Sequence, residues 1–95
     1  MKAALVFRLK YRLDDGGLVE MVVWRVPVAV AGSRHDYKYR LYFGKDGRRL
    51  VSYDNERGKG DHRHVRGREY AYRFISPEQL IADFLTDIEK ARSEK

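Results

Sequence analysis

The chain has 95 residues, no cysteine, and 20 Lys and Arg against 14 Asp and Glu, which gives a formal net charge of +6. This length predicts a single domain over residues 1–95, and the lack of cysteine excludes disulfides and thiolate metal sites. Arginine and lysine interrupt the apolar residues of the N-terminal MKAALVFRLKYRL, a pattern that fits neither a signal peptide nor a membrane span. We therefore expect a soluble, cytoplasmic protein without membrane association.

Alternation of apolar and polar residues predicts antiparallel strands before residue 75. The first strand covers residues 3–13 and a DDGG turn connects it to a second over 18–26, which Pro27 helps to end. A third strand covers 36–43, and a tight KDG turn connects it to a fourth over 48–54. The alternation of Tyr70, Tyr72 and Phe74 predicts a short fifth strand. The apolar side of the first strand consists of Leu5, Phe7, Leu9, Tyr11 and Leu13.

The C-terminal part of the chain predicts an amphipathic helix. Residues 76–79, SPEQ, form a capping box with proline at the first helical position. One helical stripe then carries Leu80, Ile81, Phe84, Leu85 and Ile88. The sequence thus predicts an α+β fold, an antiparallel meander of about five strands with a C-terminal helix packed on one face.

The segment YDNERGKGDHRH, residues 53–64, interrupts the strand pattern and carries almost no apolar mass. Gly58 and Gly60 allow its backbone to turn sharply or to approach a ligand closely. Five basic residues against Asp61 alone give residues 57–68 a local net charge of +4, which leaves +2 for the rest of the chain. The five are Arg57, Lys59, Arg63, Arg66 and Arg68. We expect them to bind the phosphates of RNA, which arginine can hold bidentately.

Two histidines in this segment predict proton transfer. If the chain is extended, His62 and His64 point to one side and Arg63 to the other. Because histidine changes its charge near neutral pH, the pair can supply a general base and a general acid, and Asp54 or Asp61 can fix a tautomer. We expect both rings in an exposed segment beside the fourth strand. These residues suit a metal-independent endoribonuclease that needs no cofactor.

Three other interpretations stay open. The segment can be a solvated basic loop whose histidines have no function, or a module that binds nucleic acid or a nucleotide without chemistry. A His-x-His sequence with a nearby aspartate can also bind zinc or another first-row metal, although the neighbouring arginines oppose it. His35 is expected to be an ordinary loop residue. Most tyrosines are expected to fill the sheet, and one or two exposed ones can stack a base.

The runs DDGGLVEMVVWRVP, HDYKYRLYF, YDNERGKGDHRH and YRFISPEQLIADFLTDI resemble the DUF6516 family of small prokaryotic proteins, toxins of the TumE type in toxin–antitoxin systems. The resemblance spans about residues 5–88, and its GKGDHRH core is rather specific. The positions that match the family's motif are Tyr53, Asp54, Asn55, Lys59, Gly60, Asp61, His62, Arg63 and His64.

The resemblance implies a toxin that is neutralised by a small antitoxin encoded beside it, often a DNA-binding regulator. It implies no catalytic role for any residue, so Tyr53, Asn55, Gly58 and Gly60 are assigned only a supporting place in the site. Unpaired strands at the two edges of a small sheet favour strand addition or dimerisation. We therefore expect RNA as substrate, and either a homodimer or a complex with the antitoxin.

Overall fold

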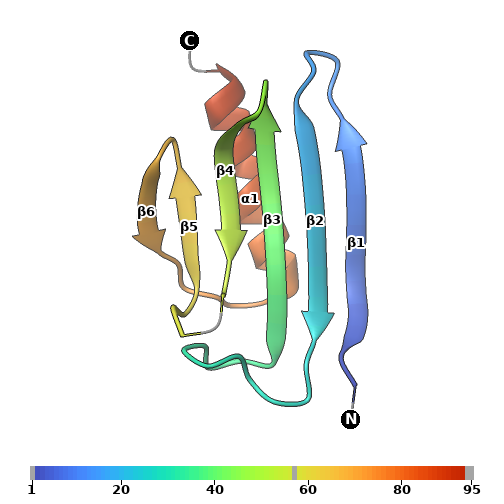
Figure 1. Ribbon diagram of the computed structural model, residues 1–95, viewed down its shortest axis with the longest axis vertical. Helices are drawn as coiled ribbons and strands as arrows, with labels where there is room; N and C mark the ends of the chain where they lie inside the picture. Colours follow the sequence, from blue (N-terminus) through green and yellow to red (C-terminus); the bar gives the residue numbers. More distant parts are fainter. Residues whose placement is uncertain (1, 57, 94–95) are drawn as a thin grey trace.

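The computed structural model describes residues 2–56 and 58–93, and in them six strands form one antiparallel sheet in chain order, followed by one helix (Figure 1). The elements are β1 (Ala4–Arg12), β2 (Leu18–Arg25), β3 (Tyr37–Lys45), β4 (Arg48–Asp54), β5 (His62–Val65), β6 (Arg68–Ala71) and α1 (Pro77–Ser93). The predicted α+β meander with a C-terminal helix is confirmed, with one strand more than expected. No helix among the described residues is long and apolar enough to cross a membrane.

The core lies between the sheet and α1, which runs behind β3 and β4 in Figure 1. The buried apolar side chains are Val19, Met21, Val23, Tyr39, Leu41, Phe43, Val51 and Tyr53 from the sheet, and Leu80, Phe84 and Ile88 from the helix. Because strand side chains alternate between faces, the residues between these point to the other side of the sheet.

We call that other side the open face. It carries Leu5, Arg8, Lys10 and Arg12 of β1, Leu18, Glu20, Val22 and Trp24 of β2, Lys38, Arg40 and Tyr42 of β3, Arg49, Ser52 and Asp54 of β4, His62 and His64 of β5, and Glu69 of β6. Most of these residues are polar or charged, which explains why no second layer covers them.

Two tight hairpins hold the later strands together. Asp46 and Gly47, between β3 and β4, have φ angles of 54° and 76°, and Arg66 and Gly67, between β5 and β6, have φ angles of 51° and 82°. Two consecutive residues with positive φ form a type I′ turn, whose twist matches that of the flanking strands. The sequence predicts the Asp46–Gly47 turn. The Arg66–Gly67 turn is not recognisable from the sequence, because arginine stands where Asn or Asp is usual.

The strands on either side of the Arg66–Gly67 turn, β5 and β6, differ from the sequence prediction. Residues 62–65 form β5 and pair with β4, so part of the glycine-rich segment belongs to the sheet. The predicted fifth strand through Phe74 is wrong, because β6 ends at Ala71. Beyond that point Tyr72 donates its backbone N–H to the Asp61 carbonyl at 3.1 Å, and Phe74 stacks on His35 with ring centroids 3.8 Å apart. Both side chains pack against the core instead of continuing the strand.

A bulge in β1 corrects a second prediction. Leu5 pairs with Trp24 and Phe7 with Val23, so one extra residue, Val6, shifts the register between them. Leu5 therefore lies on the open face and not beside Phe7 as the alternation suggests. Leu9 is on the helix side but remains 42% exposed, because α1 packs mainly on β4 and β3.

The helix begins as predicted. The Ser76 hydroxyl accepts the backbone N–H of Gln79 at 3.0 Å, which is the capping contact. The predicted apolar stripe is buried at Leu80, Phe84 and Ile88, whereas Leu85 stays 39% exposed. Asp87, a residue outside the predicted stripe, is buried against the sheet.

Candidate functional site

The two histidines of β5 lie side by side on the open face. Their ring centroids are 5.4 Å apart and their planes meet at 82°. Asp54 and Ser52 of β4 pair with His62 and His64 across the strands, and Glu69 of β6 pairs with His64 from the other side. Three neighbouring strands therefore hold this cluster, which we call the histidine site: Ser52, Asp54, His62, His64 and Glu69.

His62 makes two close contacts, and both partners are hydrogen-bond acceptors. Its Nε2 lies 2.9 Å from Oδ1 of Asp54, and its Nδ1 lies 3.0 Å from the Gly60 carbonyl oxygen. A neutral imidazole carries one N–H and can donate to only one of them, whereas a doubly protonated ring can donate to both.

His64 has a different environment. Its Nε2 lies 3.6 Å from Oε1 of Glu69, and its buried Nδ1 has no hydrogen-bond partner among the described residues. The hydroxyl of Ser52, opposite it on β4, is also buried and unpartnered within the described part of the chain. The ring of His64 is thus held less tightly than that of His62, and its side chain is more exposed, at 19% against 7%.

The expectation that both rings lie in an exposed segment is wrong for His62. The residue is only 6% exposed. Its neighbours are nevertheless polar, since Asp54, Gly60, Glu69 and His64 surround it. Pairing of β5 between β4 and β6 buries the ring, because a central strand has neighbours on both sides.

Asp61 does not join the histidine site. Its carboxylate accepts the hydroxyl of Ser33 at 2.6 Å and that of Tyr39 at 2.7 Å, and it lies 2.7 Å from Nε2 of His35. These contacts fasten the connection between β2 and β3 to the glycine-rich segment. His35 is a loop residue, as expected, and its contact with Asp61 was not foreseen from the sequence.

Asn55 and the glycines strengthen the same junction. The buried Asn55 side chain accepts the backbone N–H of Tyr39 at 3.0 Å and donates to the Tyr37 carbonyl at 2.7 Å. At Gly60, with φ of 74°, a Cβ would lie 3.0 Å from the carbonyl oxygen of Gly32. The close approach that glycine permits here is therefore between two backbone segments. Gly58 donates its N–H to Ala31 at 2.6 Å in the same place.

The four basic residues that the structure describes in segment 57–68 do not gather on one surface. Arg63 points to the helix side, where its guanidinium lies 2.8 Å from Oδ2 of Asp87 and stacks over Tyr70. Lys59 lies 3.8 Å from Glu56 in an exposed pair. Arg66 is in the β5–β6 turn and Arg68 begins β6 on the helix side. Arg57 lies outside the described residues. Their predicted role in RNA binding stays a prediction.

Tyr53 supports the sheet from the helix side. It is fully buried and donates its hydroxyl to Asp87 of α1, while Arg63 donates to the Tyr53 oxygen at 3.3 Å. Burial, and then the hydrogen bond to Asp87, raise the pKa of Tyr53 far above its ordinary value. The phenol therefore stays protonated and has a structural part behind the histidine site.

The histidine site also has the composition of a metal site. Among the described residues, Asp54, His62 and His64 offer ligand atoms that all lie within 4.8 Å of one another. Two imidazoles and a carboxylate suit zinc or another first-row divalent ion. The Nδ1 contact of His62 with a backbone carbonyl is of the kind that orients a metal-binding imidazole.

Sequence reasoning missed Ser52 and Glu69 in the site. Both follow from strand alternation once β5 and β6 are recognised, because they face the same side as the histidines. The Arg66–Gly67 turn is the sequence feature that would have located both strands.

Comparison with known proteins agrees with the sequence resemblance. No curated protein and no solved structure matches the chain. The model of the family described as Toxin TumE matches residues 2–92, which include all six strands and nearly all of α1. The chain therefore belongs to the TumE toxin family.

Proposed function

We propose that this toxin cleaves RNA in the cytoplasm without a metal ion, and that His62 and His64 transfer the protons. The observation that supports this most directly is the unequal environment of two adjacent imidazoles. One ring has two acceptors around it, and the other has none at its Nδ1 among the described residues. An acid–base pair requires such a difference, because one ring must be protonated while the other is neutral.

The contacts support the following division of the two roles. Neutral His64, the more exposed ring, takes the proton of a ribose 2′-hydroxyl. The 2′-oxygen then attacks the adjacent phosphorus, and the bond from phosphorus to the 5′-oxygen breaks. His62, which is oriented by its contacts with Asp54 and the Gly60 carbonyl, acts as the acid and gives a proton to that leaving oxygen. The products are a 2′,3′-cyclic phosphate and a 5′-hydroxyl, and no activated water is needed for this step.

A toxin of this family implies a cognate antitoxin as partner. We further propose that this antitoxin is a DNA-binding regulator, or that the toxin forms a homodimer, through the free edge of β1 or of β6. Both strands have one unpaired side in the sheet. Such an edge accepts a further strand from another chain.

The test is expression in bacteria, followed by mapping of new RNA ends. The wild-type chain should stop growth and produce fragments with 2′,3′-cyclic phosphate ends. His64→Ala should abolish both effects, and Lys90→Ala, an exposed change on α1, should leave them intact. Toxicity without new RNA ends, or new ends that persist in His64→Ala, would contradict the proposal.

Cleavage assays on the purified protein, with and without a chelator, distinguish the metal-independent mechanism from a metal-dependent one. Cleavage that continues in a chelator supports the metal-independent mechanism. Cleavage that stops in the chelator and returns with zinc or manganese would assign Asp54, His62 and His64 to a metal centre instead.

A further inference from the structure

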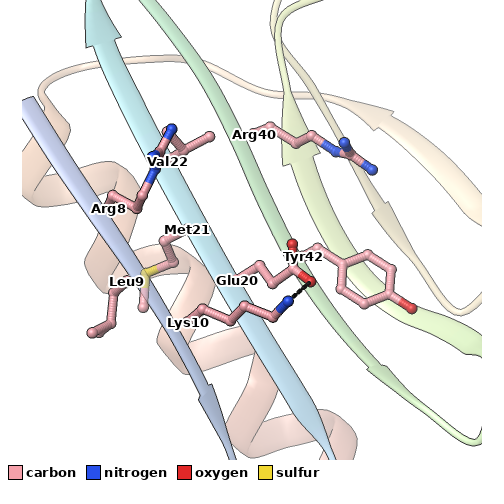
Figure 2. Close-up of a pocket in the computed structure, with 8 residues that line it drawn as sticks. All are labelled: Arg8, Leu9, Lys10, Glu20, Met21, Val22, Arg40 and Tyr42. Carbon is pink, nitrogen blue, oxygen red and sulfur yellow. Dashed lines mark ion pairs between the residues drawn. The ribbon is translucent and has the colours of Figure 1, made fainter. Parts of the chain in front are cut away.

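The open face is hollowed along a line that leads to the histidine site. One hollow of about 240 Å³ crosses β1, β2 and β3 and is lined by Arg8, Lys10, Arg40 and Tyr42 among others (Figure 2). A second, of about 470 Å³, crosses β3 and β4. Arg40 and Tyr42 line both, so the two hollows are neighbours on the open face.

The second hollow reaches the site itself. Ser52 and Asp54 form part of its lining. These are the residues that pair with His64 and His62 across the strands. A ligand that lies along both hollows therefore runs across the strands from β1 and ends at the histidines.

The two hollows are lined by arginine side chains that have no carboxylate partner among the described residues. Lys10 is paired with Glu20 at 3.7 Å, as Figure 2 shows. Among the described residues, Arg8, Arg40 and Arg49 make no ion pair. All three are exposed and line the hollows. They are free to meet phosphate oxygens.

Aromatic rings accompany these cations. Arg8 lies over the ring of Trp24, with its guanidinium carbon 5.8 Å from the ring centroid. Tyr42 lies along β3 above Gly44, where a Cβ would overlap its hydroxyl, so the glycine lets the ring lie close to the sheet. Rings and guanidinium planes presented on an open sheet are the features that single-stranded nucleic acids stack on.

The open face carries an excess of basic side chains. Within the described residues it has six basic side chains against Glu20, Asp54 and Glu69, and each of these acids faces a lysine or a histidine. The helix α1, on the other side of the sheet, carries four acidic side chains against Lys90 and Arg92. A polyanion is thus attracted to the open face more strongly than to α1.

We propose that single-stranded RNA binds across the open face, with phosphates on Arg8, Arg40 and Arg49, bases against Trp24 and Tyr42, and the scissile phosphate at His62 and His64. From β1 to β5 the path covers four strand spacings, roughly 19 Å, enough for a strand of a few nucleotides. The position of the scissile phosphate rests on the proposed function, whereas the binding surface does not.

The only tryptophan of the chain makes the surface directly observable. The probe is a 2′-O-methyl RNA of about 12 nucleotides, which cannot be cleaved because it lacks the 2′-hydroxyl. Titration into the wild-type chain should quench or shift the fluorescence of Trp24. Binding seen by anisotropy of a labelled probe without any change in tryptophan emission would place the RNA elsewhere.

Paired variants locate the phosphate contacts. Arg8→Ala/Arg40→Ala should weaken binding about tenfold and reduce the log–log salt slope by about 1.4, since each phosphate contact to a single strand contributes about 0.7. Arg73→Ala/Lys90→Ala removes the same charge away from the open face and should change neither. Trp24→Leu should weaken binding about fivefold or more and leave the salt slope unchanged, because stacking releases no counterions.

The outcomes separate this inference from the proposed function. Open-face binding without cleavage of natural RNA would support the surface and contradict the ribonuclease. Cleavage with full binding by Arg8→Ala/Arg40→Ala would support the ribonuclease and contradict the surface. If this variant binds RNA normally but is no longer neutralised by the antitoxin, the open face is a protein-binding surface and the inference is wrong.

Discussion

His62 and His64 differ in how their protons are held, although they are two residues apart on one strand. The Asp54 carboxylate lies 2.9 Å from Nε2 of His62, whereas the carboxylate next to His64, that of Glu69, lies 3.6 Å from Nε2 of that ring. The proposed division into acid and base depends on this difference. A substitution of Asp54 is therefore a direct test of the proposed acid and base roles.

Cleavage by the wild-type protein should have a bell-shaped pH–rate profile, because it needs one ring neutral and the other protonated. Asp54→Asn removes the carboxylate that lies 2.9 Å from Nε2 of His62, so the ring should be oriented less firmly and the rate at the optimum should fall. Rates measured over a pH series on a purified RNA check the shape of the profile and this loss, with Lys90→Ala as control. An unchanged rate in Asp54→Asn would show that Asp54 does not position the acid.

Asp61 offers a contrast, since its contacts are with Ser33, His35 and Tyr39 and not with the histidine site. Asp61→Ala leaves three polar groups without their acceptor and should lower the free energy of unfolding by about 2–3 kcal/mol. Urea unfolding measures this loss. The pH profile of the remaining folded enzyme should keep its shape. A changed pH–rate profile in a fully folded Asp61→Ala variant would indicate that Asp61 takes part in catalysis.

At the scale of the elements, one ion pair joins the helix to the strand that carries the histidines. Arg63 of β5 contacts Asp87 of α1 at 2.8 Å, and Tyr53 of β4 donates to the same carboxylate. Arg63 points to the helix while its neighbours His62 and His64 point to the open face. The pair thus fixes β5 from behind.

Asp87→Ala leaves Arg63 and Tyr53 without this acceptor. Because the Asp87 side chain is only 10% exposed and that of Arg63 is 36% exposed, the loss should be about 2–4 kcal/mol of unfolding free energy. Thermal and urea unfolding check the value. Glu89→Ala, on the exposed side of the same helix, should change stability by less than about 0.5 kcal/mol. Equal effects of the two changes would contradict a structural role for the pair.

The elements with strong local patterns were predicted well from the sequence. Alternation located β2, β3 and β4, and the capping box located the start of α1. The failures had local causes. The bulge at Val6 cannot be inferred from alternation, and β5 carries charged residues that resemble a loop until its pairing partners are known.

The same reasoning applies to the site. The presence of His62, His64 and Asp54 on one face follows from the spacing of the sequence and the pairing of β4 with β5. The separation of Asp61 from them does not, because it depends on a contact with His35 across 26 residues of chain. Long-range contacts of this kind leave no periodic trace in a single sequence.

At the scale of the whole molecule, three tyrosines connect the sheet to its surroundings through carboxylates. Tyr39, Tyr53 and Tyr72 donate to Asp61, Asp87 and Asp83 respectively. Burial, followed by these hydrogen bonds, raises the pKa of all three phenols well above the ordinary value.

A raised pKa means that the folded chain holds the phenol protons more tightly than the unfolded chain does. The stabilisation is complete below the ordinary tyrosine pKa of about 10 and is lost as the pH rises above it. The protein should therefore unfold cooperatively above about pH 10, together with the ionisation of these tyrosines. Tyrosinate absorbance and circular dichroism, recorded in one titration, check this. Phenols that ionise near their ordinary pKa while the fold persists would contradict it.

The order of the elements along the chain has a consequence for synthesis on the ribosome. The six strands emerge first and each pairs with the one before it, but α1, which covers the core side chains of β3 and β4, emerges last. Until the ribosome has made that helix, Leu41 and Tyr53 have no layer to cover them, and β5 lacks its contact with Asp87. The strand that carries the histidines therefore gains its support from α1 only after the helix has been synthesised.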